Sequence, residues 1–228
     1  MDKQTKRAFK DALYEQFARI GKAVASARRL ELIDVLAQGE RTVEQLAAET
    51  GMSVANASQH LQVLRRARIV EIRRQGLYVS YRLSDERVFR LWQAMRELGG
   101  ARLAEIDRIV SAYLRDRGSL EPVRAEELRN RIRHGGVVVL DVRPVEEYRS
   151  GHISGARSIP VAELDTRLRE IPKSKEVVAY CRGPYCVFAD EAVALLGERG
   201  YKARRLDVGL PDWQAMGLPV ESSVGGDR

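Results

Sequence analysis

Two short apolar runs, residues 137–140 and 177–180, limit what the second half of this chain can fold into. Neither run alternates with polar residues, as a strand with one face in water would. Both therefore predict strands that are covered on both faces, and helical patterns over residues 128–133, 161–168 and 189–199 can supply the cover. The sequence predicts an α/β domain with a mostly parallel sheet.

A cysteine directly follows the second apolar run, in the loop Cys181-Arg182-Gly183-Pro184-Tyr185-Cys186. A thiol between a strand end and a helix start meets backbone N–H groups and the positive end of the helix dipole, which favour the thiolate. The two cysteines of this loop are the only ones in 228 residues. Any thiol chemistry of the chain therefore takes place here.

The charge of the chain lies in its first half. Residues 1–118 hold 22 lysines and arginines against 15 acidic residues, whereas residues 119–228 hold 17 of each. An excess of this kind favours a partner with a phosphate backbone, double-stranded DNA, although a basic surface that serves solubility alone is the plain alternative. No apolar run is long enough for a membrane span or a signal peptide, which predicts a cytoplasmic protein without a membrane partner.

The first half has the pattern of a winged helix-turn-helix domain, a mainly α fold. Helices are expected over residues 5–24, 26–36, 42–50, 54–66 and 85–117, and a hairpin over residues 69–83. The turn at Gly51 separates two helices, of which the second has a polar outer face that suits a major groove. The hairpin is the predicted wing, with Arg73 and Arg74 at its tip for contact with phosphates or the minor groove.

Residues 5–117 resemble an ArsR-type winged-helix repressor. The resemblance is carried by Ser58-Gln59-His60-Leu61-Gln62-Val63-Leu64-Arg65-Arg66-Ala67-Arg68-Ile69-Val70. It implies a homodimer built from the first and last helices, with five side chains near base edges: Ser53, Asn56, Ser58, Gln59 and His60. The metal sites of that family cannot be assembled here, because residues 44–48 lack a thiol and the last helix lacks histidine. We therefore expect no metal and no cofactor.

Residues 120–220 resemble a rhodanese domain. Besides the cysteine loop, three segments carry the resemblance: Asp141-Val142-Arg143-Pro144-Val145-Glu146-Glu147-Tyr148, Gly151-His152-Ile153-Ser154-Gly155-Ala156-Arg157-Ser158-Ile159-Pro160 and Gly209-Leu210-Pro211-Asp212-Trp213. The resemblance implies that Cys181 attacks a sulfane sulfur and holds it as a persulfide. The loop residues Gly183, Pro184 and Tyr185 are expected to bind the donor, and Arg182 to attract it if it is anionic.

Three other side chains of this half have expected roles. Asp141 and Arg143 are predicted to form a buried or half-buried network near the loop, and His152 to be structural. Cys186 stands where many rhodaneses have a basic residue, which argues against efficient thiosulfate turnover. Cys186 is either a small apolar filler or a resolving thiol that attacks the persulfide to give a disulfide or polysulfide bridge.

The expected plan is a DNA-binding and dimerisation domain over residues 1–117, a linker over 118–122, a rhodanese-like domain over 123–222 and a flexible tail over 223–228. It predicts a transcriptional regulator, a repressor, controlled by a small sulfane-sulfur donor such as a polysulfide, a persulfide or thiosulfate. Two alternatives stay open. One is a sulfurtransferase carried on a DNA-binding module, and the other is an inert domain that serves dimerisation or partner docking.

Overall fold

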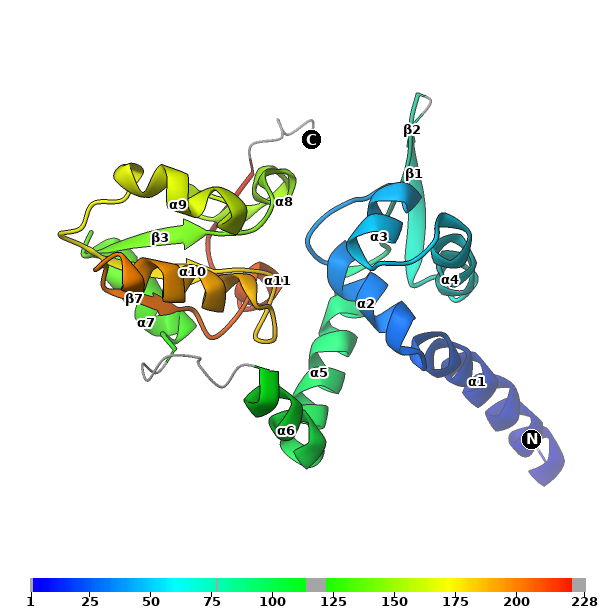
Figure 1. Cartoon of the computed structure of the whole chain (residues 1–228). Coiled ribbons are helices and arrows are strands. Elements are labelled where there is room, and N and C mark those ends of the chain that lie inside the picture. The colour runs from blue at the N-terminus through cyan, green and yellow to red at the C-terminus, as the bar shows by residue number, and fades with distance from the viewer. Residues whose placement is uncertain (1, 77, 114–121, 223–228) are drawn as a thin grey trace. The chain divides into compact units, whose positions relative to one another are not determined.

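The computed structural model describes most of the chain, namely residues 2–76, 78–113 and 122–222. The chain divides into two compact units, Met1–Trp92 and Gln93–Arg228 (Figure 1). The predicted linker, apart from Pro122, and the predicted tail lie outside the described residues. Among the helices that the structure describes, none is long and apolar enough to cross a membrane.

Four helices open the first unit: α1 (Lys3–Val24), α2 (Ala27–Leu36), α3 (Val43–Glu49) and α4 (Val54–Arg66). Asp2 and Ser53 each accept a backbone N–H at the starts of α1 and α4, and Thr42 begins α3 with the predicted capping box. Contacts among α2, α3 and α4 bury a set of leucine side chains: Leu32, Leu36, Leu46, Leu61 and Leu64. This core holds α4 by one face and leaves the opposite face in solvent.

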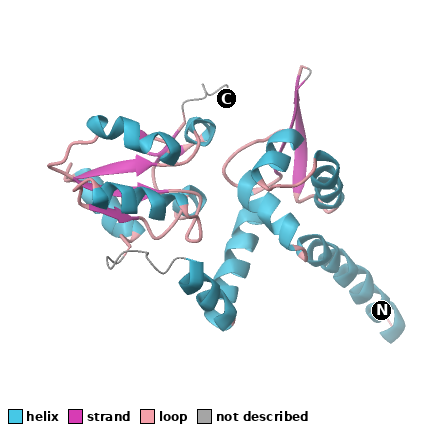
Figure 2. Ribbon diagram, in the orientation of Figure 1, coloured by secondary structure: helices cyan, strands magenta, loops and turns pink. Residues whose placement is uncertain are grey.

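The predicted wing is an antiparallel hairpin of β1 (Val70–Gln75) and β2 (Tyr78–Leu83). Gly76, in the turn, has a φ of 61°, which lies in the left-handed region that favours glycine. At its base the hairpin is tied to the helices by two backbone hydrogen bonds between Arg41 and Tyr81, of 3.1 and 2.7 Å. The base of the wing is thus fixed, whereas its end projects away from the helices (Figure 2).

The single helix predicted over residues 85–117 is wrong. The structure has two helices there, α5 (Glu86–Arg102) and α6 (Ala104–Tyr113). The break at Leu103 follows two consecutive glycines, each of which disfavours a helix by about 1 kcal/mol relative to alanine. Ile106 packs so close to Gly99 that a Cβ there would lie 3.1 Å from the isoleucine methyl group. Residues 114–117 lie outside the described residues.

A parallel sheet forms the centre of the second unit and confirms the predicted α/β class. Its strands, in the order β5-β3-β6-β7, are β3 (Val137–Asp141), β5 (Arg157–Ser158), β6 (Glu176–Tyr180) and β7 (Ala203–Arg205). A short antiparallel pair, β4 (His152–Ile153) and β8 (Val220–Glu221), lies outside this sheet. Because β3 and β6 are parallel neighbours with Asp141 opposite Tyr180, the segments that follow them leave the same edge of the sheet.

Helices cover both faces of this sheet (Figure 2). They are α7 (Ala125–Arg133), α8 (Val145–Ser150), α9 (Leu164–Arg167), α10 (Phe188–Glu198) and α11 (Leu210–Ala215). Successive residues of β6 alternate between two buried clusters: Val177 and Ala179 pack with α10, and Val178 and Tyr180 pack with α7 and α11. Burial on both sides explains why the apolar runs show no polar alternation.

One predicted helix of the second unit is much shorter than expected. Over residues 161–168 only α9 is α-helical, and it lies between the 3-10 turns η1 (Val161–Glu163) and η2 (Leu168–Glu170). A 3-10 turn rises further per residue than an α-helix. The three turns together place Val161, Leu164 and Leu168 against one core cluster.

Candidate functional site

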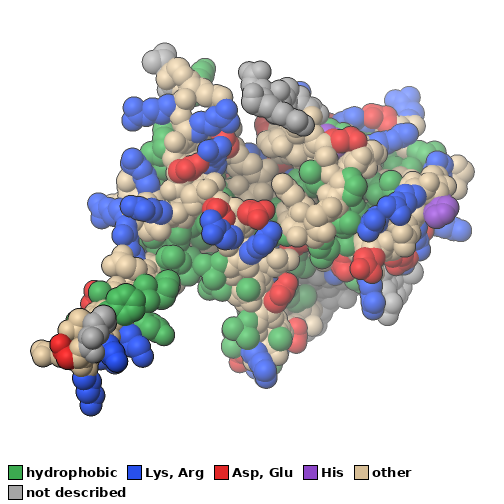
Figure 3. Space-filling model, turned by 180° about the vertical axis from the view of Figure 1, so that it is seen from behind, with side chains coloured by type: hydrophobic (Ala, Val, Ile, Leu, Met, Phe, Trp, Pro, Cys, Tyr) green, Lys and Arg blue, Asp and Glu red, His purple; other side chains and the backbone are tan. Residues whose placement is uncertain are grey.

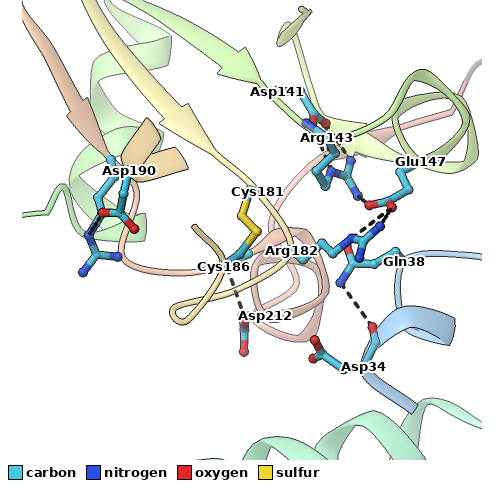
Figure 4. The surroundings of a disulfide bond; sticks show 12 residues. Asp34, Gln38, Asp141, Arg143, Glu147, Cys181, Arg182, Cys186, Asp190 and Asp212 are labelled. Carbon is cyan, nitrogen blue, oxygen red and sulfur yellow. Dashed lines mark hydrogen bonds and ion pairs between the residues drawn. A yellow bond between two sulfur atoms is a disulfide. The ribbon is translucent and has the colours of Figure 1, made fainter. Parts of the chain in front are cut away.

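The cysteine loop lies at the carboxyl ends of β3 and β6. Cys181 follows Tyr180, the last residue of β6, and Asp141 ends the neighbouring strand (Figure 4). Open α/β sheets commonly bind ligands at this edge. The chain thus places the predicted nucleophile and the predicted Asp141–Arg143 pair at one end of the sheet.

Cys181 and Cys186 form a disulfide, with their Cα atoms 6.4 Å apart. A turn brings the second cysteine back towards the first, because the Cys186 amide donates a 3.1 Å hydrogen bond to the carbonyl of Gly183. The turn therefore uses one of the backbone N–H groups near the thiol for a hydrogen bond within the loop. Cys181 is 2% exposed, whereas Cys186 is half-buried and contacts the apolar core beneath the loop. Cys186 is thus bonded to Cys181 and packed on the core at once, and its role as a resolving thiol stays a prediction.

Arg182 is directed into the protein and does not extend toward a donor. Its guanidinium donates two hydrogen bonds, of 3.0 and 2.5 Å, to one carboxylate oxygen of Glu147 in α8. Glu147 has no exposed side-chain surface, and Arg182 is 17% exposed. The expectation that Arg182 attracts an anionic donor does not agree with this geometry, because reaching outward would leave a buried carboxylate without this ion pair.

A second buried ion pair lies next to the first. The guanidinium of Arg143 donates to both oxygens of Asp141, at 3.0 and 2.6 Å, and to the carbonyl of Gly151. Burial acts to lower the pKa of Arg143, but the adjacent Asp141 carboxylate outweighs it and raises that pKa. The Tyr180 hydroxyl donates to Asp141, and burial raises the pKa of this phenol well above its ordinary value. Arg143 therefore stays charged and Tyr180 stays neutral beneath the loop.

His152 has contacts typical of a structural residue. Its ring stacks on Tyr148 with centroids 3.7 Å apart, and its Nδ1 lies 2.8 Å from the Tyr148 carbonyl oxygen. His152 is buried, and its other ring nitrogen faces the Glu221 carboxylate at 3.6 Å. These contacts hold β4 beside α8.

Sequence reasoning assigned no role to Glu147 or Asp212, two buried carboxylates at this end of the sheet. Glu147 lies four residues after Arg143, a spacing that pairs charges on a helix and offered a signal. Asp212 is the third residue of α11 and accepts the amide of Gly209, 3.2 Å away. The Gly209 position has no space for a side chain, because a Cβ would overlap the Arg182 carbonyl. The backbone of the cysteine loop therefore rests directly on the start of α11.

In the first unit, two of the predicted DNA contacts, Asn56 and Gln59, lie on the exposed side of α4, and Ser58 and His60 lie beside its buried residues. Asn56 and Gln59 are exposed, Ser58 and His60 are half-buried, and the Ser53 hydroxyl is used to cap the helix. The buried positions of α4 are Ala57, Leu61 and Leu64. Asn56 and Gln59 thus present polar side chains at the helix surface, of the kind that reads base edges in a major groove.

The two wing arginines differ in their surroundings. Arg73 donates to the carboxylate of Glu40 at 3.1 Å, and Ser80, its cross-strand neighbour, donates to the same carboxylate. Arg74 is exposed and lies on the other face of the hairpin. Arg73 is exposed as well, but its ion pair with Glu40 leaves Arg74 as the arginine of the two with the better access to a phosphate.

The fold and these two sites define a winged helix-turn-helix regulator joined to a rhodanese-like domain. Residues 26–71 match the family model for bacterial regulatory proteins of the arsR family, and residues 124–216 match that for rhodanese-like domains. The chain is 46% identical over 217 residues, 94% of each protein, to the HTH-type transcriptional regulator Rv0324 of Mycobacterium tuberculosis. The protein belongs to the ArsR family of transcriptional regulators and carries a C-terminal rhodanese-like domain.

Two further relatives each match one half. A sulfurtransferase of Allochromatium vinosum is 33% identical over 90 residues, which span 39% of this chain and 82% of that protein. A homodimeric winged helix-turn-helix DNA-binding fragment from Mycobacterium bovis, solved by NMR, is 46% identical. It covers 41% of this chain and 87% of its own, with a TM-score of 0.40.

Proposed function

We propose that this regulator is a homodimeric cytoplasmic repressor whose DNA affinity is set by sulfane sulfur at Cys181 and Cys186. The observation that carries the proposal is the pairing of both cysteines in one bridge, at the sheet edge where the predicted nucleophile lies. A bridge between the only two thiols of the chain gives the loop two stable covalent states. Two states are what a signal requires.

The bridge follows from a balanced reaction with a small persulfide, RS–SH. The Cys181 thiolate attacks the outer sulfur, which forms Cys181–S–SH and releases the thiolate RS⁻. The Cys186 thiolate then attacks Sγ of Cys181, which forms the disulfide and expels HS⁻. The persulfide is reduced to a thiol and hydrogen sulfide while the two cysteines are oxidised, so no other oxidant is needed.

Support for the homodimer comes from α1, where a row of apolar side chains lies in solvent (Figure 3). Phe9 is 61% exposed and Phe17 58%, and Leu13 and Ile20 continue the row at helical spacing. A 22-residue helix with such a face is a docking surface for another helix. A second copy of the chain supplies the matching helix and, with it, a second α4 for a duplex site.

A binding measurement on the full chain tests the proposal without knowledge of the operator. Duplex DNA is first selected from a random pool by the dithiol protein, and its affinity is then compared before and after treatment with glutathione persulfide. We expect the bridge, identified by the loss of two hydrogen atoms in intact mass, to weaken DNA binding about tenfold or more. Cys181→Ser should keep its affinity under the same treatment. Equal affinity of the dithiol and bridged wild-type protein would refute the proposal.

The sulfurtransferase alternative is favoured by one observation, the similarity of residues in the second unit to the A. vinosum sulfurtransferase. It predicts many turnovers of a persulfide donor with a thiol or cyanide as acceptor, whereas a switch reacts once and waits for a reductant. Cys186→Ser separates the two. As a switch component, Cys186 is needed for the bridge, so its loss stops the reaction at the Cys181 persulfide. If Cys186 only lies next to a transferase site, its loss leaves turnover unchanged.

A further inference from the structure

One face of the second half of α5 lies against the cysteine loop and α11. Gln93, Arg96 and Gly100 share this face, since they are spaced by three and four residues. All three belong to the second unit, together with the loop. Gln93 and Arg96 contact Asp212 of α11, and Gly100 faces Tyr185 of the cysteine loop.

Asp212 is the point where α5 and α11 meet. Its carboxylate accepts a hydrogen bond from the guanidinium of Arg96 and another, of 3.1 Å, from the side-chain amide of Gln93. The ion pair is buried, with 9% of the Arg96 side chain and 2% of the Asp212 side chain exposed. The same carboxylate caps α11 at Gly209. Because the buried Asp212 carboxylate would lose these hydrogen bonds if its partners moved, it holds Arg96, Gln93 and Gly209 in one arrangement.

The cysteine loop contacts both helices that Asp212 joins, α11 and α5. Its backbone at Arg182 and Gly183 rests on Gly209, where a Cβ would lie 2.6 Å from the Gly183 nitrogen. Farther along, the Tyr185 hydroxyl approaches Gly100 of α5 so closely that a Cβ there would lie 3.2 Å from it. Tyr185 directly precedes Cys186, the half-buried end of the bridge. A movement of Cys186 therefore changes how the loop packs against α5.

We propose that Asp212, held by Arg96 and Gln93, is a positioning residue that transmits the state of the Cys181–Cys186 bridge to residues 93–102 of α5. The inference rests on the proposed function for its biological meaning, but the transmission itself is independent of DNA. Opening the bridge frees Cys186 from Cys181, and the adjacent Tyr185 can then leave its position against Gly100. The buried Arg96–Asp212 pair ties α5 to α11, so α5 moves with the loop and does not slide over it.

Hydrogen exchange of the full chain, followed by mass spectrometry, tests the transmission directly. Amides of residues 93–102 are compared in the dithiol and the bridged protein, for the wild type, for Arg96→Gln and for Arg102→Gln. Arg102 is an exposed arginine of the same helix and serves as the matched control. We expect a several-fold difference in exchange between the two states of the wild type and of Arg102→Gln, and less than about a twofold difference in Arg96→Gln. Equal exchange in both wild-type states, or an undiminished difference in Arg96→Gln, would overturn the inference.

A second measurement covers the case in which Arg96→Gln does not fold. Coupling is reciprocal, so a change on α5 must alter the equilibrium between dithiol and bridge in a glutathione buffer. Gly100→Ala adds a methyl group against Tyr185 and is expected to shift that equilibrium several-fold. Gly197→Ala, where nothing lies within 4 Å, is expected to leave it unchanged. An unshifted equilibrium in Gly100→Ala would also overturn the inference.

Failure of the inference and failure of the proposed function are distinguishable. If bridged and dithiol wild-type protein bind the selected duplex equally, the proposed function fails, whatever the exchange shows. If DNA affinity responds to the bridge while exchange at residues 93–102 does not, the signal exists and Asp212 does not carry it.

Discussion

The buried pair of Glu147 and Arg182 allows a quantitative prediction for the second unit. Glu147→Gln keeps the shape of the side chain and removes its charge at a site without exposed surface. The two hydrogen bonds from Arg182 then go to a neutral group and stabilise by about 0.5–1.5 kcal/mol each. Hydrogen bonds to a charged group stabilise by about 1.5–3 kcal/mol each. Breaking a buried ion pair costs about 3–5 kcal/mol. Because 17% of Arg182 remains exposed, we expect a loss of about 3 kcal/mol, near the lower limit.

The assay is guanidinium unfolding of the full chain under reducing conditions, followed by fluorescence. The chain has two tryptophans, so a Trp92→Phe background leaves Trp213, which is 1% exposed, as the single reporter of the second unit. Glu170→Gln is the matched control, because its carboxylate pairs with Arg167 in solvent, where ion pairs add little. If Glu147→Gln unfolds at the same denaturant concentration as Glu170→Gln, the buried pair gives no net stabilisation and the reasoning is wrong.

Three further predictions concern other residues. Arg68 has a φ of 59° and Gly51 a φ of 63°, both in the left-handed region that favours glycine. In thermal unfolding, Arg68→Gly should stabilise the first unit by about 1 kcal/mol and Gly51→Ala should destabilise it. The reverse signs would contradict the argument. Burial raises the pKa of the Asp207 carboxyl above 3.8, so the contribution of this residue to stability is present below pH 3.8 and is lost as the pH rises through the folded-state pKa. Asp207→Asn should therefore stabilise the second unit at neutral pH and not below pH 3.8, as measured by urea unfolding under the two conditions. Arg74→Ala should lower the salt dependence of DNA binding by about one phosphate contact and Arg73→Ala by less, because Glu40 neutralises Arg73; equal slopes would count against this assignment.

Features set by local chemistry were predictable from the sequence. The capping box at Thr42 needs only residues three positions apart, and the structure has it. The two apolar runs gave the central parallel strands, because burial on both faces leaves a compositional signature. The order strand, Cys181, helix predicts that the candidate nucleophile follows the carboxyl end of a strand, and the structure has it directly after β6.

What depends on long-range packing was not predictable. The break between α5 and α6 needs Ile106 to pack on Gly99, and periodicity alone continued the helix. Strands of two residues, such as β4 and β5, are too short to show a period. The inward direction of Arg182 depends on Glu147, 35 residues earlier, and no local pattern of residues indicates such a distant pair.

The unequal exposure of the two bridged sulfurs has a consequence for recovery of the reduced protein. In the bridged protein, a small thiol that arrives from solvent reaches Cys186 first, since Cys181 is almost fully enclosed in that state. Attack there leaves the mixed disulfide on Cys186 and expels Cys181 as a thiolate. In the proposed switch, Cys181 is thereby regenerated while Cys186 still carries the small thiol, so reloading begins at Cys181 and recovery at Cys186.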